Sequence, residues 1–187
     1  MKITTKKLTL MALLIALSTV LSFSPIKLPQ GGSITFLSMF FIVIIGYFLD
    51  PKLGLLSGFI YGLIQFAMGG YFLTIPQFCL DYIFAFSALG FGAFVYRKKS
   101  KFSLEIVCVI SMLARLFFVF LAGIVFYGDY APEGMPVALY SIVYNSTYII
   151  PELILTLVVL RIPIFRTTLY KVMSRFSDMN LVDVPNI

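Results

Sequence analysis

The sequence contains no histidine and no tryptophan, and only two cysteines. Without histidine, the Ser-His and Cys-His nucleophile arrangements and the His-based zinc motifs are excluded. A Ser-Lys or carboxylate-pair enzyme stays open, but the lysines all fall in loops or at segment ends. We therefore expect no enzyme, no cofactor and no metal site. Cys79 and Cys108 fall near opposite ends of their apolar segments, which predicts two free thiols and no disulfide.

A nucleotide-binding loop is also missing. The glycine pairs at 31–32 and 69–70 are not followed by the lysine of the G-x-x-x-x-G-K-[ST] motif, whose backbone and lysine hold phosphates. The protein is therefore not expected to hydrolyse ATP itself.

Charge is scarce as well: only 12% of the residues are charged, against roughly 25% in an ordinary soluble domain. With 60% hydrophobic residues and a mean hydropathy of +1.02, the composition is that of a membrane protein. Apolar segments near the ~20 residues that cross a bilayer recur along the chain. We expect spans at 8–23, 34–49, 53–68, 76–96, 104–127 and 137–160.

The connections between these segments are short, which predicts antiparallel neighbours. The predicted fold is an all-α integral membrane protein, with six transmembrane helices in one compact bundle and a single domain over 1–187. The first segment also has the basic and apolar regions of a signal peptide, but it lacks a clear small-x-small cleavage site. We interpret it as the first helix.

The basic residues predict the orientation. With a cytoplasmic N-terminus, only Lys27 lies in an outer loop and Arg115 lies within a span. By the positive-inside rule both termini are cytoplasmic. The inner side then holds Lys2, Lys6, Lys7, Lys52, Arg97, Lys98, Lys99, Lys101, Arg161, Arg166, Lys171 and Arg175. Such scattered charges meet anionic lipid headgroups and do not predict nucleic-acid binding.

Three ionisable residues fall inside spans, where each costs around 2.5 to 3.5 kcal/mol on insertion scales and so marks a functional hypothesis. Asp81, near the outer end of the fourth segment, is either a structural carboxylate or the counter-charge of a bound cation. Arg115 begins a series with Val119, Gly123 and Tyr127 that shares one helix face, and it is a candidate partner for Glu152. Gly123 fits a helix-packing contact as well as the floor of a ligand site.

Polar residues are also concentrated at 138–152, in "ALYSIVYNSTYIIPE". Tyr140 pairs with Tyr144 and Ser141 with Asn145 at i, i+4, so together they form a broad wall on the outermost turns of the sixth segment. An interfacial aromatic belt explains the tyrosines but not Asn145. With Asp81, and with Tyr71 and Tyr130 in outer loops, this wall predicts a pocket for a small, flat, cationic molecule.

The chain resembles the substrate-binding S-components of energy-coupling factor (ECF) vitamin transporters, and within them the ThiT-type thiamine-binding family. The resemblance covers nearly the whole chain and rests on the six-segment layout and on "LPQGGS" at 28–33, "LDYIFAF" at 80–86 and "LAGIVFYGDYAPEGMPVALYSIVYNSTYIIP" at 121–151. It implies a prokaryotic cell-membrane protein that captures thiamine from outside. The binding residues it implies are Asp81, Tyr82, Tyr71, Gly123, Tyr127, Tyr140 and Asn145.

The resemblance also implies partners: a transmembrane coupling protein and two ATPase subunits. The family docks on the coupling protein through an A-x-x-x-A surface of the first helix, here Ala12 and Ala16. Small residues four apart let helices approach closely, although packing within the protein would use the same spacing.

Departures from the family pattern keep a second ligand open. Val119 stands where family members have histidine, Tyr127 where some have tryptophan, and Asp81 where they have glutamate. The alternatives are an S-component for another small vitamin or precursor, such as a hydroxymethyl-aminopyrimidine, and a self-sufficient secondary carrier. A carrier typically shows internal repeats and discontinuous helices; the sequence shows no repeat, although Pro151 offers a break in the sixth segment.

Overall fold

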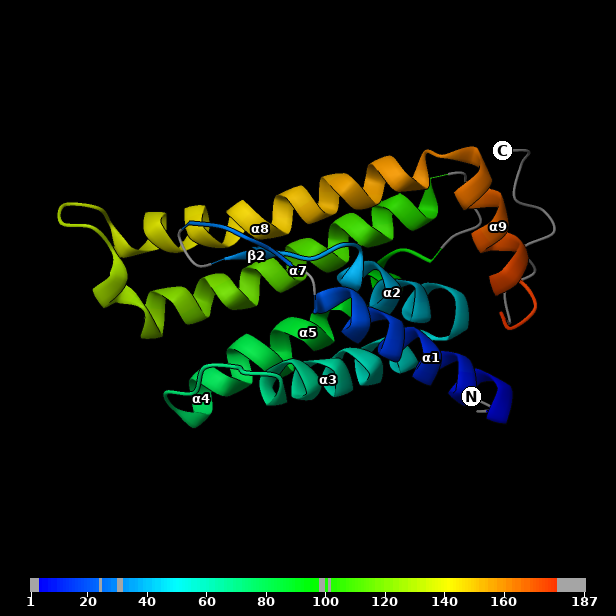
Figure 1. The fold of residues 1–187 in the computed structure, drawn as a ribbon, viewed down its shortest axis with the longest axis horizontal. Coiled ribbons are helices and arrows are strands. Elements are labelled where there is room, and N and C mark those ends of the chain that lie inside the picture. Colours follow the sequence, from blue (N-terminus) through cyan, green and yellow to red (C-terminus); the bar gives the residue numbers. More distant parts are fainter. Residues whose placement is uncertain (1–3, 24, 30–31, 98–99, 101, 178–187) are drawn as a thin grey trace.

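A computed structural model describes residues 4–23, 25–29, 32–97, 100 and 102–177. Most of this chain is helical, and its long helices run along one axis (Figure 1). In chain order the elements are α1 (Thr5–Ser22), β1 (Ile26–Lys27), β2 (Ser33–Ile34), α2 (Ser38–Ile44), η1 (Ile45–Leu49), α3 (Pro51–Ala67), α4 (Ile75–Phe78), η2 (Cys79–Phe84), α5 (Ala85–Ser87), η3 (Ala88–Gly90), α6 (Gly92–Val95), α7 (Ser103–Phe126), η4 (Gly128–Tyr130), α8 (Val137–Leu160) and α9 (Pro163–Met173).

Helix starts follow from local chemistry. Thr4 caps α1, Asp50 caps α3 and Thr74 caps α4, each through a side-chain oxygen that accepts a backbone N–H of the first turn. Pro51 follows the cap of α3 at the first helical position, where its missing N–H costs nothing.

Each predicted span contains helix, and α8 coincides with the predicted 137–160. Among the described residues, four helical stretches are long and apolar enough to cross a membrane: Thr5–Ser22, Ile75–Val95, Ser103–Phe126 and Val137–Leu160. The second predicted span was too long, because Ile34 lies in β2 and pairs with Ile26 of β1, so the apolar helical stretch is Ser38–Leu49. Pro151, which offered a possible break in the sixth segment, does not interrupt the helix, because α8 continues through it.

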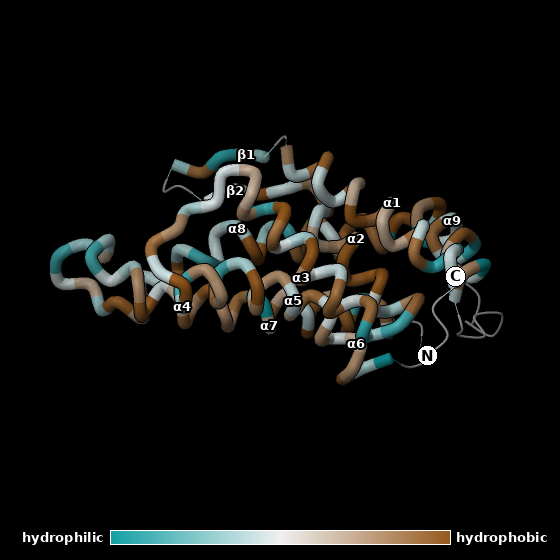
Figure 2. Tube along the Cα trace, turned by 90° about the horizontal axis from the view of Figure 1, so that it is seen from below, coloured by the Kyte–Doolittle hydropathy of each residue, from teal (hydrophilic) through white to brown (hydrophobic). Residues whose placement is uncertain are grey.

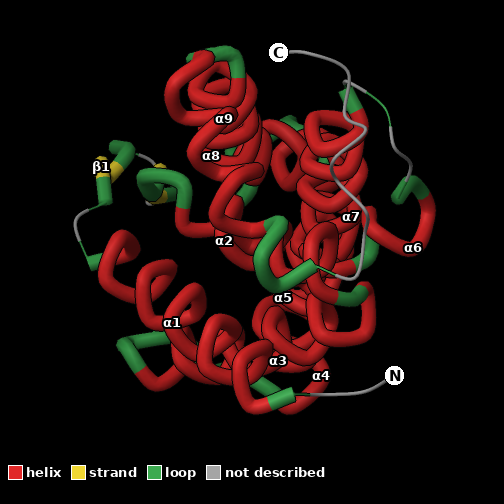
Figure 3. The backbone as a smooth tube through the Cα atoms, turned by 90° about the vertical axis from the view of Figure 1, so that its right-hand side faces the viewer, coloured by secondary structure: helices red, strands yellow, loops and turns green. Residues whose placement is uncertain are grey.

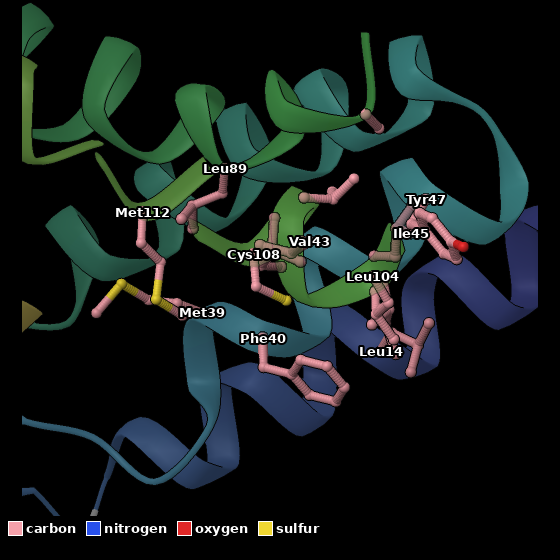
Figure 4. Packing of buried hydrophobic residues seen from close by; sticks show 14 of the residues in the cluster. Leu14, Met39, Phe40, Val43, Ile45, Tyr47, Leu89, Leu104, Cys108 and Met112 are labelled. Carbon is pink, nitrogen blue, oxygen red and sulfur yellow. The ribbon is translucent and has the colours of Figure 1, made fainter. Parts of the chain in front are cut away.

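The short stretch formed by α2 and η1 lies inside the bundle, between α1 and the helices α7 and α5 (Figure 3). Its side chains are almost entirely buried; Figure 4 shows Phe40, Val43 and Ile45 packed with Leu104 and Cys108 of α7. Because other helices cover this stretch, its apolar side chains are explained by packing in the protein core as well as by contact with lipid.

Glycines of α3 bring it against the helical run Ile75–Val95. A Cβ added at Gly58 would lie 2.2 Å from the carbonyl oxygen of Phe86, and one at Gly62 would lie 2.2 Å from that of Tyr82. Only a residue without a side chain permits such contact, as in small-xxx-small helix packing. The run itself contains the π-helical turn η2, an irregularity that often occurs at functional sites.

Helix α9 was not predicted. It crosses the end of α8, and its buried Arg166 forms an ion pair with Glu105 of α7 (Figure 1). The side chain of Tyr170 is also buried there, and burial raises the pKa of its hydroxyl. The first residues of α1 lie at the same end of the bundle as α9, and the hydrophilic stretches gather largely toward the two ends (Figure 2).

Candidate ligand-binding site

A cavity of about 720 Å³ lies at the end of the bundle opposite α9. Its walls come from the end of α3, the turn η2, the C-terminal half of α7, the first turns of α8, Ser22 of α1 and Ser33 of β2. All seven binding residues named from the sequence line it: Tyr71, Asp81, Tyr82, Gly123, Tyr127, Tyr140 and Asn145. Asp81 is the only acidic side chain among the described lining residues.

The Asp81 carboxylate lies on η2 and is held from one side. Gln77 Nε2 donates to Asp81 Oδ2 at 2.6 Å, and the Tyr127 hydroxyl donates to the same oxygen at 2.8 Å. The other oxygen, Oδ1, has no hydrogen-bonding partner among the described residues. An oriented carboxylate with one oxygen unengaged can accept a hydrogen bond from a ligand or face its positive charge.

Gln77 was missed by the sequence analysis. It precedes Asp81 by one helical turn and is fully buried. Its amide donates to Asp81, and its oxygen accepts the backbone N–H of Leu73 at 3.0 Å. An amide four residues before a carboxylate in an apolar helix was the signal that could have identified it.

Tyr82 shapes the cavity through its ring and its hydroxyl. The hydroxyl accepts the backbone N–H of Tyr71 at 2.8 Å, and the ring packs at 5.2 Å from that of Phe66. Tyr71 is half exposed, with its ring 6.5 Å from that of Tyr127. These contacts hold the loop after α3 over the cavity and leave the Tyr71 ring accessible.

The predicted face of α7 forms one wall, since Arg115, Val119, Gly123 and Tyr127 all line the cavity. A Cβ at Gly123 would lie 2.0 Å from Ser141 Oγ. Gly123 is therefore a packing contact between α7 and α8 as well as part of the wall, so both interpretations from the sequence apply.

The polar wall on α8 is present: the rings of Tyr140 and Tyr144 are tilted with centroids 5.9 Å apart, and those of Tyr144 and Tyr148 meet edge to face at 6.1 Å. Asn145 is bonded inside the protein: Nδ2 donates to the carbonyl oxygen of Ser141 at 2.9 Å and Oδ1 accepts the Tyr148 hydroxyl at 2.5 Å. A ligand nitrogen would therefore compete with these bonds for the Asn145 amide.

Arg115 does not pair with Glu152, contrary to the expected interaction. The Arg115 guanidinium lies 3.8 Å from the centroid of the Phe86 ring, and its Nε and Nη1 have no hydrogen-bonding partner in the part of the chain that the structure describes. Glu152 instead accepts hydrogen bonds from Thr35 and Met39. Arg115 also lines a smaller adjoining chamber of about 350 Å³. The positive charge of Arg115 disfavours a cation in this chamber and so favours a cation near Asp81.

Comparisons with known proteins agree on one family. A family model described as "Thiamine transporter protein" matches residues 8–172. The thiamine transporter ThiT of Bacillus subtilis is 37% identical over 147 residues, 72% of this chain and 76% of that protein. ThiT of Lacticaseibacillus paracasei is 29% identical over 119 residues, 55% of this chain and 59% of that protein. A solved structure of ThiT from Listeria monocytogenes superposes with a TM-score of 0.68 at 24% identity, over 90% of this chain and 93% of that one, which shows a shared fold.

Proposed function

Because the chain belongs to the thiamine transporter family, we propose that it is the substrate-binding subunit of an ECF-type importer and captures thiamine in the cavity that contains Asp81. Family membership makes thiamine uptake the function of the chain and makes it a multi-pass protein of a bacterial membrane. It is also a transporter family, which agrees with a protein that has no catalytic role.

The observation that carries the proposal is that all seven named residues line one cavity, in which Asp81 is the one acidic side chain among the described lining residues. Thiamine combines a permanently cationic thiazolium ring with a flat aminopyrimidine. Aromatic faces attract such a cation by ~0.5 to 2 kcal/mol each, and a carboxylate offsets its charge in a site with little water. The tyrosines around Asp81 supply those faces. Asp81 Oδ1, which has no hydrogen-bonding partner among the described residues, would accept a hydrogen bond from thiamine or face its positive charge.

The proposed topology has six crossings with both termini in the cytoplasm. Two of them are short, since Ser38–Leu49 has an apolar length below that of a full span and α3 has 17 residues. Support comes from the start of α1 and from α9, which lie at one end of the bundle, away from the cavity. The basic residues Lys2, Lys98, Lys99 and Lys101 of the inner side lie outside the described residues.

Energy would come from separate subunits, a transmembrane coupling protein and two ATPases. Ala12 and Ala16 are both exposed on α1, next to the exposed Leu13 and Leu17. A small-residue groove beside large apolar side chains suits close approach of a helix from a partner membrane protein.

Isothermal titration calorimetry of the detergent-purified protein tests the ligand. We expect one-to-one binding of thiamine, weaker binding of a hydroxymethyl-aminopyrimidine, which lacks the cationic ring, and no binding of riboflavin. Tighter binding of the aminopyrimidine than of thiamine would move the ligand to the precursor. Thiamine uptake by vesicles that contain this chain alone would instead favour the secondary carrier.

A further inference from the structure

The segment that joins α1 to α2 forms part of the cavity wall. We call residues 32–37 the strap. It contains β2, which contacts α8, and it continues into Ser38 at the start of α2 (Figure 1). Ser33 lines the large cavity, and Gly32, Ser33 and Thr35 line the adjoining chamber. Any ligand in these cavities is thus covered on one side by the strap.

The Thr35 end of the strap is not helical, yet it lies against the interior of the apolar helix α8. It meets α8 at Glu152, which lies 15 residues after Val137 and hence about 22 Å along α8 at 1.5 Å per residue. Non-helical backbone at such depth must have its N–H and C=O groups satisfied by other parts of the protein. The strap therefore needs partners on the neighbouring helices.

Glu152 supplies these partners with a fully buried carboxylate. Its Oε2 accepts the backbone N–H of Thr35 at 3.1 Å and the Thr35 hydroxyl at 2.5 Å. Its Oε1 accepts the N–H of Met39 at 3.1 Å. Helix α2 has no side-chain cap of its own, so Glu152 satisfies an N–H of its first turn from another helix.

The junction between the strap and α2 is strained. Leu37 has a φ of 62°, the only positive φ of a non-glycine residue among the described residues. A side chain with a Cβ rarely adopts this left-handed conformation unless its surroundings hold it there. The bonds from Glu152 lie on both sides of Leu37, at Thr35 and at Met39, and can hold it.

The strap also packs on the ligand-facing wall. A Cβ at Gly32 would lie 2.8 Å from Cδ1 of Tyr148, whose hydroxyl donates to Asn145. The strap therefore contacts α8 at two levels: Gly32 on Tyr148 at the cavity, and Thr35 on Glu152 one turn further in.

We propose that Thr35 and Glu152 form a latch that holds the strap closed over the cavity and so slows dissociation of the ligand. Glu152 is not among the described residues that line either cavity, so it is a positioning residue that acts through the strap. Opening the strap leaves the buried Glu152 carboxyl group without its hydrogen-bond donors, which is costly and keeps the latch closed. This inference rests on the proposed capture of thiamine.

Thr35→Val and Thr35→Ser test the latch as a matched pair. Valine keeps the shape of Thr35 and removes the hydroxyl that donates to Glu152, whereas serine keeps the hydroxyl. Thr147→Val is the control, because Thr147 is also half-buried, but its hydroxyl donates within α8, to the carbonyl oxygen of Tyr144. The whole chain in detergent is used throughout.

Hydrogen exchange of the ligand-free protein and the dissociation rate of labelled thiamine are the two measurements. In Thr35→Val we expect the amides of Thr35 to Met39 to exchange at least tenfold faster, and thiamine to leave about five- to tenfold faster. Thr35→Ser and Thr147→Val should stay within twofold of the parent in both. A merely structural role would lower the melting temperature without selective exchange in this segment.

The proposal is overturned if Thr35→Val leaves the exchange of these amides unchanged, or if their exchange rises while thiamine leaves at the parental rate. Hydrogen exchange needs no ligand. If the parent protein fails to bind thiamine, the proposed function fails, and the exchange data still decide whether Thr35 and Glu152 hold the strap.

Discussion

At the scale of single residues, Asp81 is held by Gln77 and Tyr127 through one oxygen, Oδ2. This asymmetry separates two roles of the carboxylate in the proposed site: the bonds to Oδ2 fix its orientation, and Oδ1 is the oxygen that we propose accepts from or faces the ligand. A carboxylate that is already oriented loses little freedom on binding, which favours affinity.

Replacement of Asp81 by asparagine keeps the shape of the side chain and removes its charge. We expect the affinity for thiamine to fall by about 2 kcal/mol or more, on the order of thirtyfold, because the cationic ring loses its counter-charge. Calorimetry measures this loss. Asp129→Asn, on the exposed outer turn η4, is the charge-matched control and should bind as the parent does. Equal affinity in Asp81→Asn would remove Asp81 from the site.

The grouping of these side chains could be predicted from sequence, but their bonds could not. Helical spacing places Val119, Gly123 and Tyr127 on one face, and the short connections place that face beside α8. The bond from Gln77 to Tyr127 and that from Tyr148 to Asn145 depend on how far neighbouring helices are rotated and shifted, which periodicity does not determine.

At the scale of elements, the pattern of apolar residues predicts α8 well and α2 poorly. The stretch from Ile34 to Leu49 is almost continuously apolar, so hydropathy cannot separate strand from helix within it. The separation comes from the pairing of Ile26 with Ile34 and from the left-handed Leu37. Helix α9 was missed because it is too short and too polar to be a span.

The contact between α7 and α8 yields a prediction about stability. Gly123→Ala puts a Cβ 2.0 Å from Ser141 Oγ and 2.8 Å from Ser141 Cβ, so the Ser141 side chain or the two helices must shift, and we expect a loss of about 1 to 3 kcal/mol in the free energy of unfolding. Thermal unfolding in detergent measures it. Ser141→Gly in the same chain should recover part of the loss. Gly128→Ala, whose added Cβ would meet only ordinary contacts at 3.5 Å, should change little.

Loss of stability in Gly128→Ala equal to that in Gly123→Ala would contradict the close contact as its cause. So would a double variant, with Gly123→Ala and Ser141→Gly, that is no more stable than Gly123→Ala alone.

At the scale of the whole molecule, the proposed sites for thiamine capture and for coupling occupy different surfaces. The cavity is lined mainly by α7, α8 and the turn η2, whereas the side chains of Ala12 and Ala16 are exposed on α1. Helix α1 is still joined to the cavity, because the strap follows it in the chain. A partner that moves α1 would therefore act on the strap and its latch, which gives coupling a route to ligand release.

Replacing both Ala12 and Ala16 by leucine should separate thiamine binding from coupled thiamine uptake. The larger side chains fill the groove on α1 without reaching the cavity, so thiamine affinity of the isolated protein should stay within twofold of the parent. Uptake by vesicles that also contain the coupling protein and ATPases should fall at least tenfold, since close helix packing depends on small residues. Ala138→Leu, an exposed alanine of α8, is the control and should transport normally. Undiminished uptake by the double variant would place the coupling surface elsewhere, whereas lost binding would show that α1 supports the cavity directly.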